Sequence, residues 1–113
     1  MATDTLVTQM RKGALEYIVL ALLTKQSRYG FEIVHTLSQV DGLLTSEGTI
    51  YPLLGRLRRD GLVQTEWKES SEGPPRRYYR LTAEGQRALR TFRDEWTTFR
   101  SAVDAILTSG GKS

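Results

Sequence analysis

Small, donor-bearing and basic side chains recur on one side of residues 47–63, which read EGTIYPLLGRLRRDGLV. The apolar side chains of this segment are spaced like one face of a helix: Ile50, Leu53, Leu54 and Leu57. The opposite face carries Gly55, which costs about 1 kcal/mol relative to alanine in a helix interior. Arginines on that face can donate to phosphates and guanine edges. The pattern therefore predicts a helix whose outer face touches a polyanion closely.

Few other residues suit catalysis or metal binding. The chain has no cysteine, which excludes disulfides and thiolate metal sites. His35 is the single histidine, and one histidine with a carboxylate does not make a typical transition-metal site. Gly73-Pro74-Pro75 lacks the strand-to-helix context of a phosphate-binding loop. Because no nucleophile–base pair stands out, we expect neither an enzyme nor a metal or other cofactor.

The basic residues gather in one part of the chain. Its 113 residues carry a net charge of +3 and suit one domain. Residues 56–80 hold seven basic and four acidic side chains, which accounts for the whole excess. The N-terminus lacks the pattern of a signal peptide, and the longest apolar stretch, residues 18–23, is too short to cross a bilayer. We therefore expect a soluble cytoplasmic protein with a polyanionic partner and no membrane contact.

Three helices are predicted in the first half of the chain. Residues 13–26 are apolar on most sides, as in a buried helix, and residues 29–40 form a second helix. The third helix begins either at Ser46, a good N-cap, or near Thr49, which would leave Pro52 in the first turn. Its end is predicted at Asp60-Gly61, because glycine favours the left-handed C-cap.

Two alternating runs predict strands after these helices. Val63 to Trp67 and Arg77 to Leu81 each place alternate residues on one face, so at least one of Tyr78 and Tyr79 should lie in the core. The seven residues between them, ESSEGPP, are too many for a tight turn. The runs therefore predict a two-stranded ribbon with a protruding tip, followed by a last helix capped by Thr82.

The last helix has the most regular apolar spacing in the chain. Its apolar residues follow each other at intervals of 3, 4, 3, 4 and 3, as in a coiled-coil seam: Leu89, Phe92, Trp96, Phe99, Val103 and Ile106. These residues could pack only on their own domain. No later element is available to cover them, however, so the pattern favours a homodimer held together by this helix.

Three helices followed by a ribbon are typical of a winged helix-turn-helix, a mainly α protein with a two-stranded β-wing (α+β). We expect residues 1–81 to form the DNA-binding domain, residues 82–108 the dimerisation helix and residues 109–113 a disordered tail. The third helix would enter the major groove. The predicted DNA-facing residues lie on this helix and on the wing: Ser46, Thr49, Tyr51, Pro52, Gly55, Arg56, Arg59, Arg76 and Arg77.

Three runs of the sequence resemble the PadR-like transcriptional regulators: YGFEI at 29–33, SEGTIYPLLGRLRRDGLV at 46–63 and RRYYRLTAEG at 76–85. The resemblance covers residues 13 to about 108, and the single last helix is similar to the short subgroup that includes multidrug-responsive repressors. The resemblance implies a homodimeric repressor that binds double-stranded DNA. Gly55 and Arg58 depart from the family's pattern, so base contacts are not carried over to them.

The same resemblance implies a ligand site at the dimer centre. A tryptophan at the matching position stacks on flat aromatic ligands in that subgroup, which points to Trp96 with Phe92 and Phe99 beside it. Met10 and Leu15 are further lining candidates. We therefore expect a repressor whose two recognition helices, about 34 Å apart, are released from DNA by a small hydrophobic or planar ligand. The alternative is a winged-helix module that binds proteins and has no effector of its own.

Overall fold

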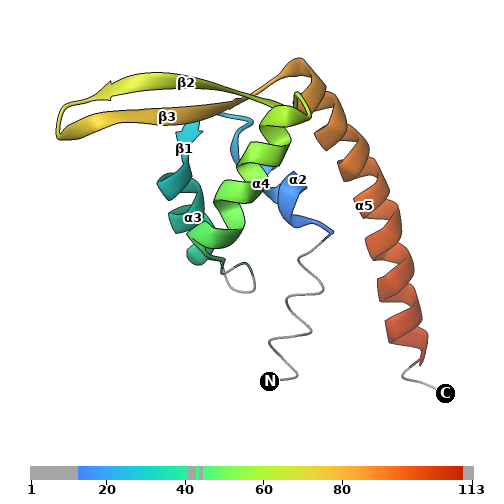
Figure 1. Cartoon of the computed structure of the whole chain (residues 1–113). Coiled ribbons are helices and arrows are strands. Elements are labelled where there is room, and N and C mark those ends of the chain that lie inside the picture. The colour runs from blue at the N-terminus through green and yellow to red at the C-terminus, as the bar shows by residue number, and fades with distance from the viewer. Residues whose placement is uncertain (1–12, 41–42, 44, 111–113) are drawn as a thin grey trace.

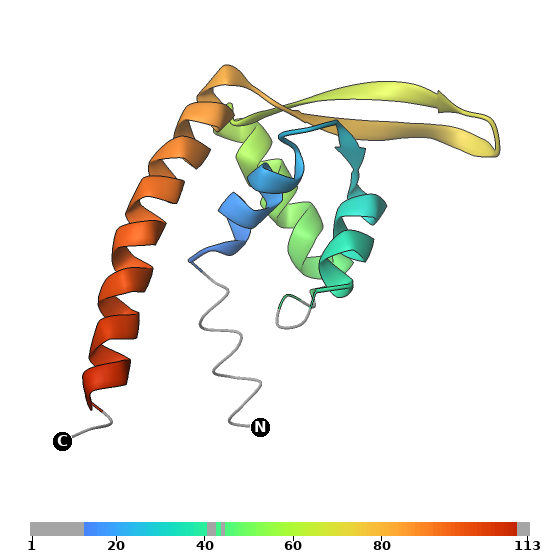
Figure 2. The ribbon, with the colours of Figure 1, turned by 180° about the vertical axis from the view of Figure 1, so that it is seen from behind.

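The computed structural model describes residues 13–40, 43 and 45–110. Its elements follow in the order α2 (Leu15–Leu22), β1 (Arg28–Tyr29), α3 (Gly30–Ser38), α4 (Glu47–Arg59), β2 (Val63–Ser70), β3 (Gly73–Leu81) and α5 (Ala83–Gly110). A body of three helices lies between the β2–β3 ribbon, which projects to one side, and α5, which leaves along the other (Figures 1 and 2). The chain is thus a winged helix-turn-helix with a long terminal helix, as predicted.

The first helix is shorter than its apolar run. The sequence predicts a helix over residues 13–26, but α2 ends at Leu22. Beyond it, Arg28 Nε donates to the Leu22 carbonyl (2.9 Å), and the Ala21 carbonyl accepts from both Thr24 Oγ1 (2.8 Å) and Thr24 N–H (3.2 Å). The last carbonyls of the helix are therefore satisfied by side-chain donors together with a tighter backbone turn.

The sheet has three strands, so the prediction of a two-stranded wing was incomplete. Tyr29, predicted to begin a helix, has an extended backbone (φ −92°, ψ 163°) and pairs with Tyr78 of β3. The strand order is β1-β3-β2, and all neighbours are antiparallel. Tyr29 N–H also donates to Glu32 Oε1 (3.0 Å), which fixes the start of α3 at Gly30. The predicted end of this helix at Val40 is also two residues too late.

The tip of the wing is tighter than predicted. Ser70 pairs with Gly73, so the turn consists of two residues, and the predicted seven-residue loop is wrong. The register shifts between Lys68 and Ser70, as at a β-bulge. Pro74 and Pro75 lie in β3 beyond the short β1, where β3 has a neighbour on one side only, and an edge position tolerates prolines.

The recognition helix begins at the earlier of the two predicted starts. Ser46 is the N-cap residue of α4, and the N–H groups of Thr49 and Ile50 donate to its carbonyl (3.1 and 3.0 Å). Pro52 therefore lies inside the helix, where it leaves the Gly48 carbonyl without the usual amide partner.

The other end of α4 confirms the predicted cap. Gly61 has φ +77°, its N–H donates to the Arg58 carbonyl (3.1 Å), and Leu62 N–H donates to the Leu57 carbonyl (3.0 Å). These two bonds form a Schellman motif, which needs a left-handed residue after the helix.

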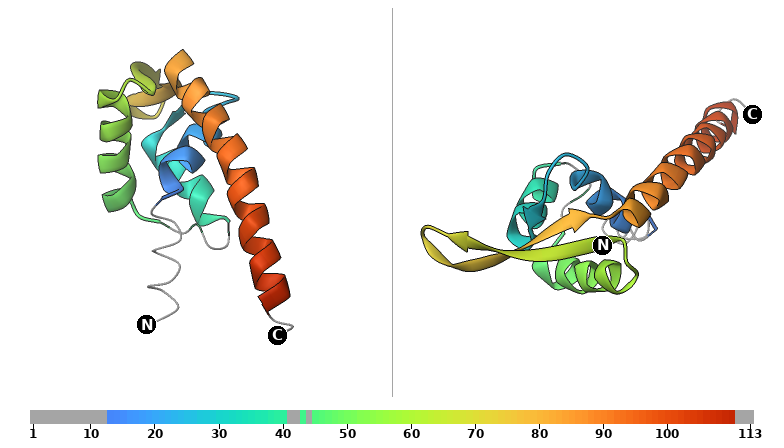
Figure 3. Two further views of the ribbon diagram at one scale, coloured as in Figure 1. Left: turned by 90° about the vertical axis from the view of Figure 1, so that its right-hand side faces the viewer. Right: turned by 90° about the horizontal axis from the view of Figure 1, so that it is seen from above.

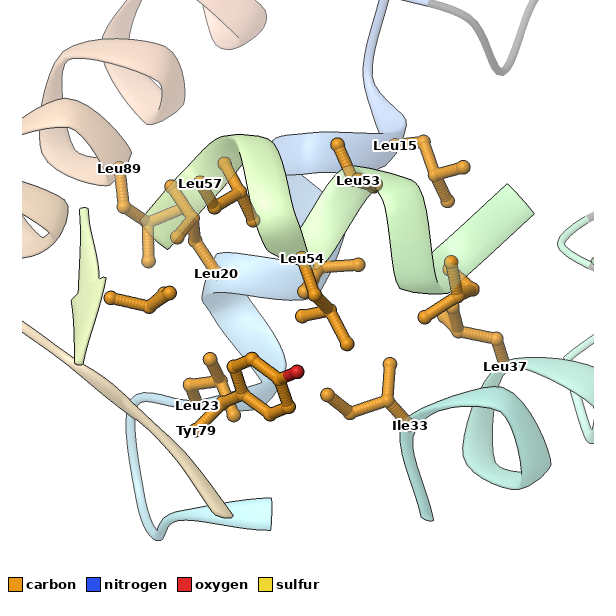
Figure 4. Packing of buried hydrophobic residues seen from close by; sticks show 13 residues of the cluster. Leu15, Leu20, Leu23, Ile33, Leu37, Leu53, Leu54, Leu57, Tyr79 and Leu89 are labelled. Carbon is orange, nitrogen blue, oxygen red and sulfur yellow. The ribbon is translucent and has the colours of Figure 1, made fainter. Parts of the chain in front are cut away.

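The core forms around the inner face of α4, as its spacing predicts. Side chains from α2, α3, β2, β3 and α5 converge on that face (Figure 4). Tyr79 is the wing tyrosine that lies in the core, and Tyr78 is half-buried. The buried apolar residues are Leu15, Val19, Leu20, Leu23, Ile33, Leu37, Ile50, Leu53, Leu54, Leu57, Val63, Tyr79 and Leu89.

The junction between the wing and α5 is closely packed. Thr82 caps α5, as predicted: its Oγ1 accepts from Gly85 N–H (3.0 Å) and donates to the Gly61 carbonyl (2.7 Å). A Cβ at residue 85 would collide with the Leu62 carbonyl oxygen, so only glycine fits there. These contacts fix the direction in which α5 leaves the body.

The end of α5 corrects the predicted domain limits. Ser109 and Gly110 belong to the helix, so the disordered tail predicted for 109–113 is wrong at these two residues. Residues 111–113 lie outside the described part of the chain.

Candidate nucleic-acid interface

Four of the predicted DNA-facing residues line one groove. Thr49, Pro52, Arg56 and Arg59 lie three or four residues apart along α4, which places them on one side of the helix. With residues 15, 16 and 53 they surround an open groove of about 400 Å³ between α4 and the start of α2. Figure 1 shows α4 crossing in front of α2 with the wing above it. The groove is therefore lined by two guanidinium groups and by the small residues of the predicted contact face.

Arg56 has a partner that the sequence analysis missed. Its Nη2 donates to Glu16 Oε2 of α2 across 2.9 Å. The side chains are 53% and 26% exposed, so the ion pair lies at the mouth of the groove and not in the core. The two residues are forty positions apart, and no local pattern in the sequence predicts their contact.

Arg59 lies back along its own helix. A Cβ added to Gly55 would be 3.6 Å from Arg59 Nη1, so the guanidinium passes over the glycine. Arg59 is exposed, and no ion pair to it is found among the described residues. Gly55 thus lets the Arg59 guanidinium lie close to the helix backbone, and the predicted close approach of DNA at this residue stays a prediction.

The ring of Tyr51 packs on α3, the other helix of the helix-turn-helix pair, and the residue remains 43% exposed. A Cβ at Gly30, the first residue of α3, would collide with the Tyr51 ring. Partial burial raises the pKa of Tyr51, with smaller contributions from Glu47, Tyr79 and Tyr29. Its hydroxyl therefore stays protonated at neutral pH and can donate a hydrogen bond.

Ser46 and Thr49 bring two hydroxyl groups to the start of α4. Ser46 Oγ lies 3.4 Å from Thr49 Oγ1 and makes no hydrogen bond to the helix backbone. Both residues are exposed, and Thr49 also lines the groove, so their oxygens can contact another molecule.

Arg76 lies on the outer face of the sheet, stacked on an aromatic ring. Its Cζ is 4.4 Å from the centroid of Tyr29, and Lys68 Nζ lies 4.6 Å from the centroid of Tyr78. The two rings meet edge to face at 5.4 Å. Cation–π contacts hold both cations along the strands. Lys68 was not predicted as a contact residue, because its partner strand brings it beside Arg76 only in the folded ribbon.

Arg77 lies on the opposite face of the wing. Its guanidinium carbon is 5.0 Å from the centroid of Trp67, which is exposed. Arg77 Nε is buried and has no hydrogen-bond partner among the described residues. β3 thus carries Arg76 and Arg80 on one face and Arg77 on the other; Arg76 and Arg80 are exposed, whereas Arg77 is half-buried.

The predicted ligand-binding aromatics form a row along α5. Phe92 stacks on Tyr17 of α2, with centroids 4.4 Å apart and an angle of 6° between the rings. Trp96 follows at 5.9 Å from Phe92, and Phe99 at 6.1 Å from Trp96. The side chains are 42% exposed at Trp96, 61% at Phe99 and 71% at Ile106. The row therefore begins on the body of the protomer and becomes exposed along the helix.

Four other residues were predicted for the dimer seam or the ligand site, and they are not members of this aromatic row. Leu89, predicted to lie in the dimer seam, is buried in the protomer's own core, because the first turns of α5 still pack on α2 and β3. Leu15 lines the groove beside α4 and is not part of the aromatic row. Met10 lies outside the described residues. Val103 is half-buried on the same side of α5 as the row.

The described residues carry neither a metal-binding cluster nor a membrane-spanning helix. They contain no group of three histidine, cysteine, aspartate or glutamate side chains that could hold a metal ion. No helix within 13–40 or 45–110 is long and apolar enough to cross a membrane.

Comparison with known proteins identifies the family. Residues 19–91 match the family described as "Transcriptional regulator PadR-like family". A transcriptional regulator of Mycobacterium tuberculosis is 33% identical over 81 residues, which is 72% of this chain and 74% of that protein.

Solved structures agree in both sequence and fold. A PadR-like transcriptional regulator from Bacillus cereus is 36% identical, with a TM-score of 0.80 over 88% of this chain and 96% of the other. A PadR family regulator from Eggerthella lenta is 34% identical, with a TM-score of 0.83 over 94% of this chain and 92% of the other. The family comprises transcriptional regulators and not enzymes. This chain therefore belongs to the PadR-like family of transcriptional regulators.

Proposed function

We propose that the protein is a homodimeric, cytoplasmic repressor that binds operator DNA through α4 and the wing and is released by a planar or hydrophobic ligand. The observation that carries DNA binding is the row of Thr49, Pro52, Arg56 and Arg59 around an open groove. Arginines contact phosphates and base edges, and small residues admit the DNA backbone. Arg76 on the exposed face of the wing supplies a further cation for a neighbouring phosphate.

The outer half of α5 supports the proposed dimer. Trp96, Phe99 and Ile106 are exposed, and they follow each other at the spacing of a coiled-coil seam. A second copy of α5, packed around a two-fold axis, would cover these side chains. The same axis would set two α4 helices at the spacing of successive major grooves, about 34 Å.

The aromatic row supports the proposed ligand. Trp96 lies between Phe92 and Phe99 at about 6 Å from each, so two such rows facing each other would line a flat, apolar space. A ring system bound there would favour one spacing of the subunits. It would weaken DNA binding only by its differential affinity for that spacing. Met10 remains a predicted contact from the N-terminal segment.

The test of DNA binding is its dependence on salt. We expect the logarithm of the association constant for operator DNA, selected from random sequences, to fall linearly with the logarithm of salt concentration, by roughly 0.9 for each phosphate contact. A protein partner at the same surface is the competing hypothesis. A flat salt response, or no binding to any selected DNA, would favour that hypothesis.

The ligand site is tested by substituting Trp96, with Trp67 on the wing as the control position. A flat cationic dye should quench the fluorescence of Trp96, and Trp96→Ala should abolish dye binding while operator binding persists. Trp67 lies on the wing, so Trp67→Phe should leave dye binding unchanged. Normal dye binding by the Trp96→Ala protein would show that the ligand site is elsewhere.

A further inference from the structure

Among the described residues that line the groove on α4, Glu16 is the one with an acidic side chain. Its neighbours fix its position on both sides: Leu15 is buried, and Tyr17 stacks on Phe92 of α5. In Figure 3 α2 lies between α4 and α5, so Glu16 faces α4 while Tyr17 faces α5. The backbone at Glu16 is therefore held beside the groove, with the carboxylate within reach of α4.

The contact of Glu16 with Arg56 directs a guanidinium toward a carboxylate of the same chain. Nη2 of Arg56 points toward α2 and lies 2.9 Å from the carboxylate. The charge of Arg56 is thereby balanced within the protein, at the position where the proposed function needs a free cation. Both side chains are partly exposed, and such ion pairs are weak enough for a phosphate to compete with them.

We infer that Glu16 is a positioning residue that lowers the affinity for DNA, because its carboxylate competes with phosphate for Arg56. The inference rests on the proposed DNA binding through α4. A regulator that must leave its operator gains from such competition, since the carboxylate takes over the guanidinium when DNA departs. Glu16 thus helps to set the affinity from which a ligand has to release the protein.

The experiment measures operator affinity and its salt dependence for the full-length protein and for Glu16→Gln. Glutamine keeps the size of the side chain and removes its charge. We expect tighter binding by up to about fivefold, the upper end of what a partly exposed ion pair allows. The slope of the logarithm of the association constant against the logarithm of salt concentration (the salt slope) should become steeper by about 0.9, the value for one more phosphate contact.

The matched control is Glu84→Gln, which removes an equal charge from an exposed ion pair with Arg87 at the start of α5. This variant should bind DNA as the unchanged protein does. An equal gain in affinity in both variants would mean that net charge alone matters, and it would overturn the inference. Thermal unfolding of each variant checks that the fold is intact.

A double-mutant cycle with Arg56→Ala decides whether Glu16 acts through Arg56. The gain from Glu16→Gln should largely disappear when Arg56 is absent. If the full gain persists, the carboxylate repels DNA by itself. If Glu16→Gln weakens binding, the carboxylate instead holds Arg56 in the DNA-binding orientation. Either result overturns the inference and leaves the proposed function standing, whereas an unchanged protein that binds no DNA would overturn both.

Discussion

The groove between α2 and α4 and the outer half of α5 expose different kinds of side chain. The groove is lined by arginines, a threonine, a proline and Glu16, and Arg56 already has a partner within the chain. The outer half of α5 exposes Trp96, Phe99 and Ile106. Water solvates charged and hydroxyl groups well, whereas covering a large apolar side chain gains roughly 1.5–3 kcal/mol.

This difference separates two functions in the protomer. The groove can stay open in the free protein, because its charges are hydrated or paired. The apolar row contributes favourable free energy only when another apolar surface covers it and removes it from water. The groove is therefore suited to reversible binding of a charged partner, and the row on α5 to a contact that persists. The two regions meet at α2, whose residues Glu16 and Tyr17 contact α4 and α5 respectively.

The largest expected effect comes from placing a charge in the apolar row. Ile106→Glu would bring two carboxylates together at the two-fold axis, so we expect the dimer to dissociate. Loss of the second half-site contact should then weaken operator binding by roughly 100-fold or more. Light scattering combined with size-exclusion chromatography measures the first effect, and a DNA-binding titration measures the second.

Ser101→Glu is the control for this prediction, because residue 101 lies on the side of α5 opposite to residues 99 and 103. It should leave the dimer and its DNA affinity unchanged. A monomeric unchanged protein at micromolar concentrations would contradict the role assigned to the outer half of α5.

Regular patterns made much of this molecule predictable from its sequence. The 3.6-residue period of Ile50, Leu53, Leu54 and Leu57 gave the inner face of α4, because one helix face must be buried. Gly61 marked the end of α4, because few other residues adopt a positive φ. Both features depend on residues close together in the chain.

Other features depend on contacts between distant residues. β1 has two residues, too few for a period, and it exists because β3 lies beside it. The pair Glu16–Arg56 joins two helices across the groove. Leu89 matches the period of the seam, but whether it packs on its own body or on a second copy depends on where α5 leaves the wing. Such contacts follow from the tertiary arrangement and leave no local pattern.

Arg59→Ala tests the groove side of the comparison. Removing one charge-assisted hydrogen bond should weaken DNA binding roughly tenfold, and the salt slope should fall by about 0.9. The loss should be similar for all DNA sequences, since a phosphate contact carries no sequence information. The Arg59→Lys protein keeps the charge and should lose less DNA affinity. A loss confined to operators that differ at one base pair would show instead that Arg59 reads a base.

Gly55→Ala should stabilise the fold and at the same time weaken DNA binding. The added Cβ would be 3.6 Å from Arg59 Nη1, an ordinary contact, so the substitution causes no collision. Alanine should raise the free energy of unfolding by about 1 kcal/mol. The methyl group would also occupy the contact face of α4, so we expect DNA affinity to fall a few-fold. Chemical denaturation and a DNA titration measure the two changes, and a gain in both would show that this face does not approach DNA closely.

The smallest effect concerns two tyrosines, one on each of the helices that border the groove. Burial raises the pKa of Tyr51, which packs on α3, and burial together with Glu16 raises that of Tyr17 beside the aromatic row. Each phenol is thus harder to ionise in the folded protein than its usual value of 10 implies. Its contribution to stability is complete below that pH and is lost as pH rises through the raised pKa.

We expect the free energy of unfolding to depend little on these groups from pH 7 to pH 9, and to fall above about pH 10. Tyr17→Phe and Tyr51→Phe should each make that fall shallower, as measured by urea denaturation at a series of pH values. The Tyr17→Phe protein should also keep its stack on Phe92, because phenylalanine retains the ring. An unchanged pH dependence in both variants would mean that neither hydroxyl is more buried in the folded protein than in the unfolded chain. The two tyrosines would then differ in the residues that they contact, Gly30 for Tyr51 and Phe92 for Tyr17, but not in the ease with which their hydroxyls ionise.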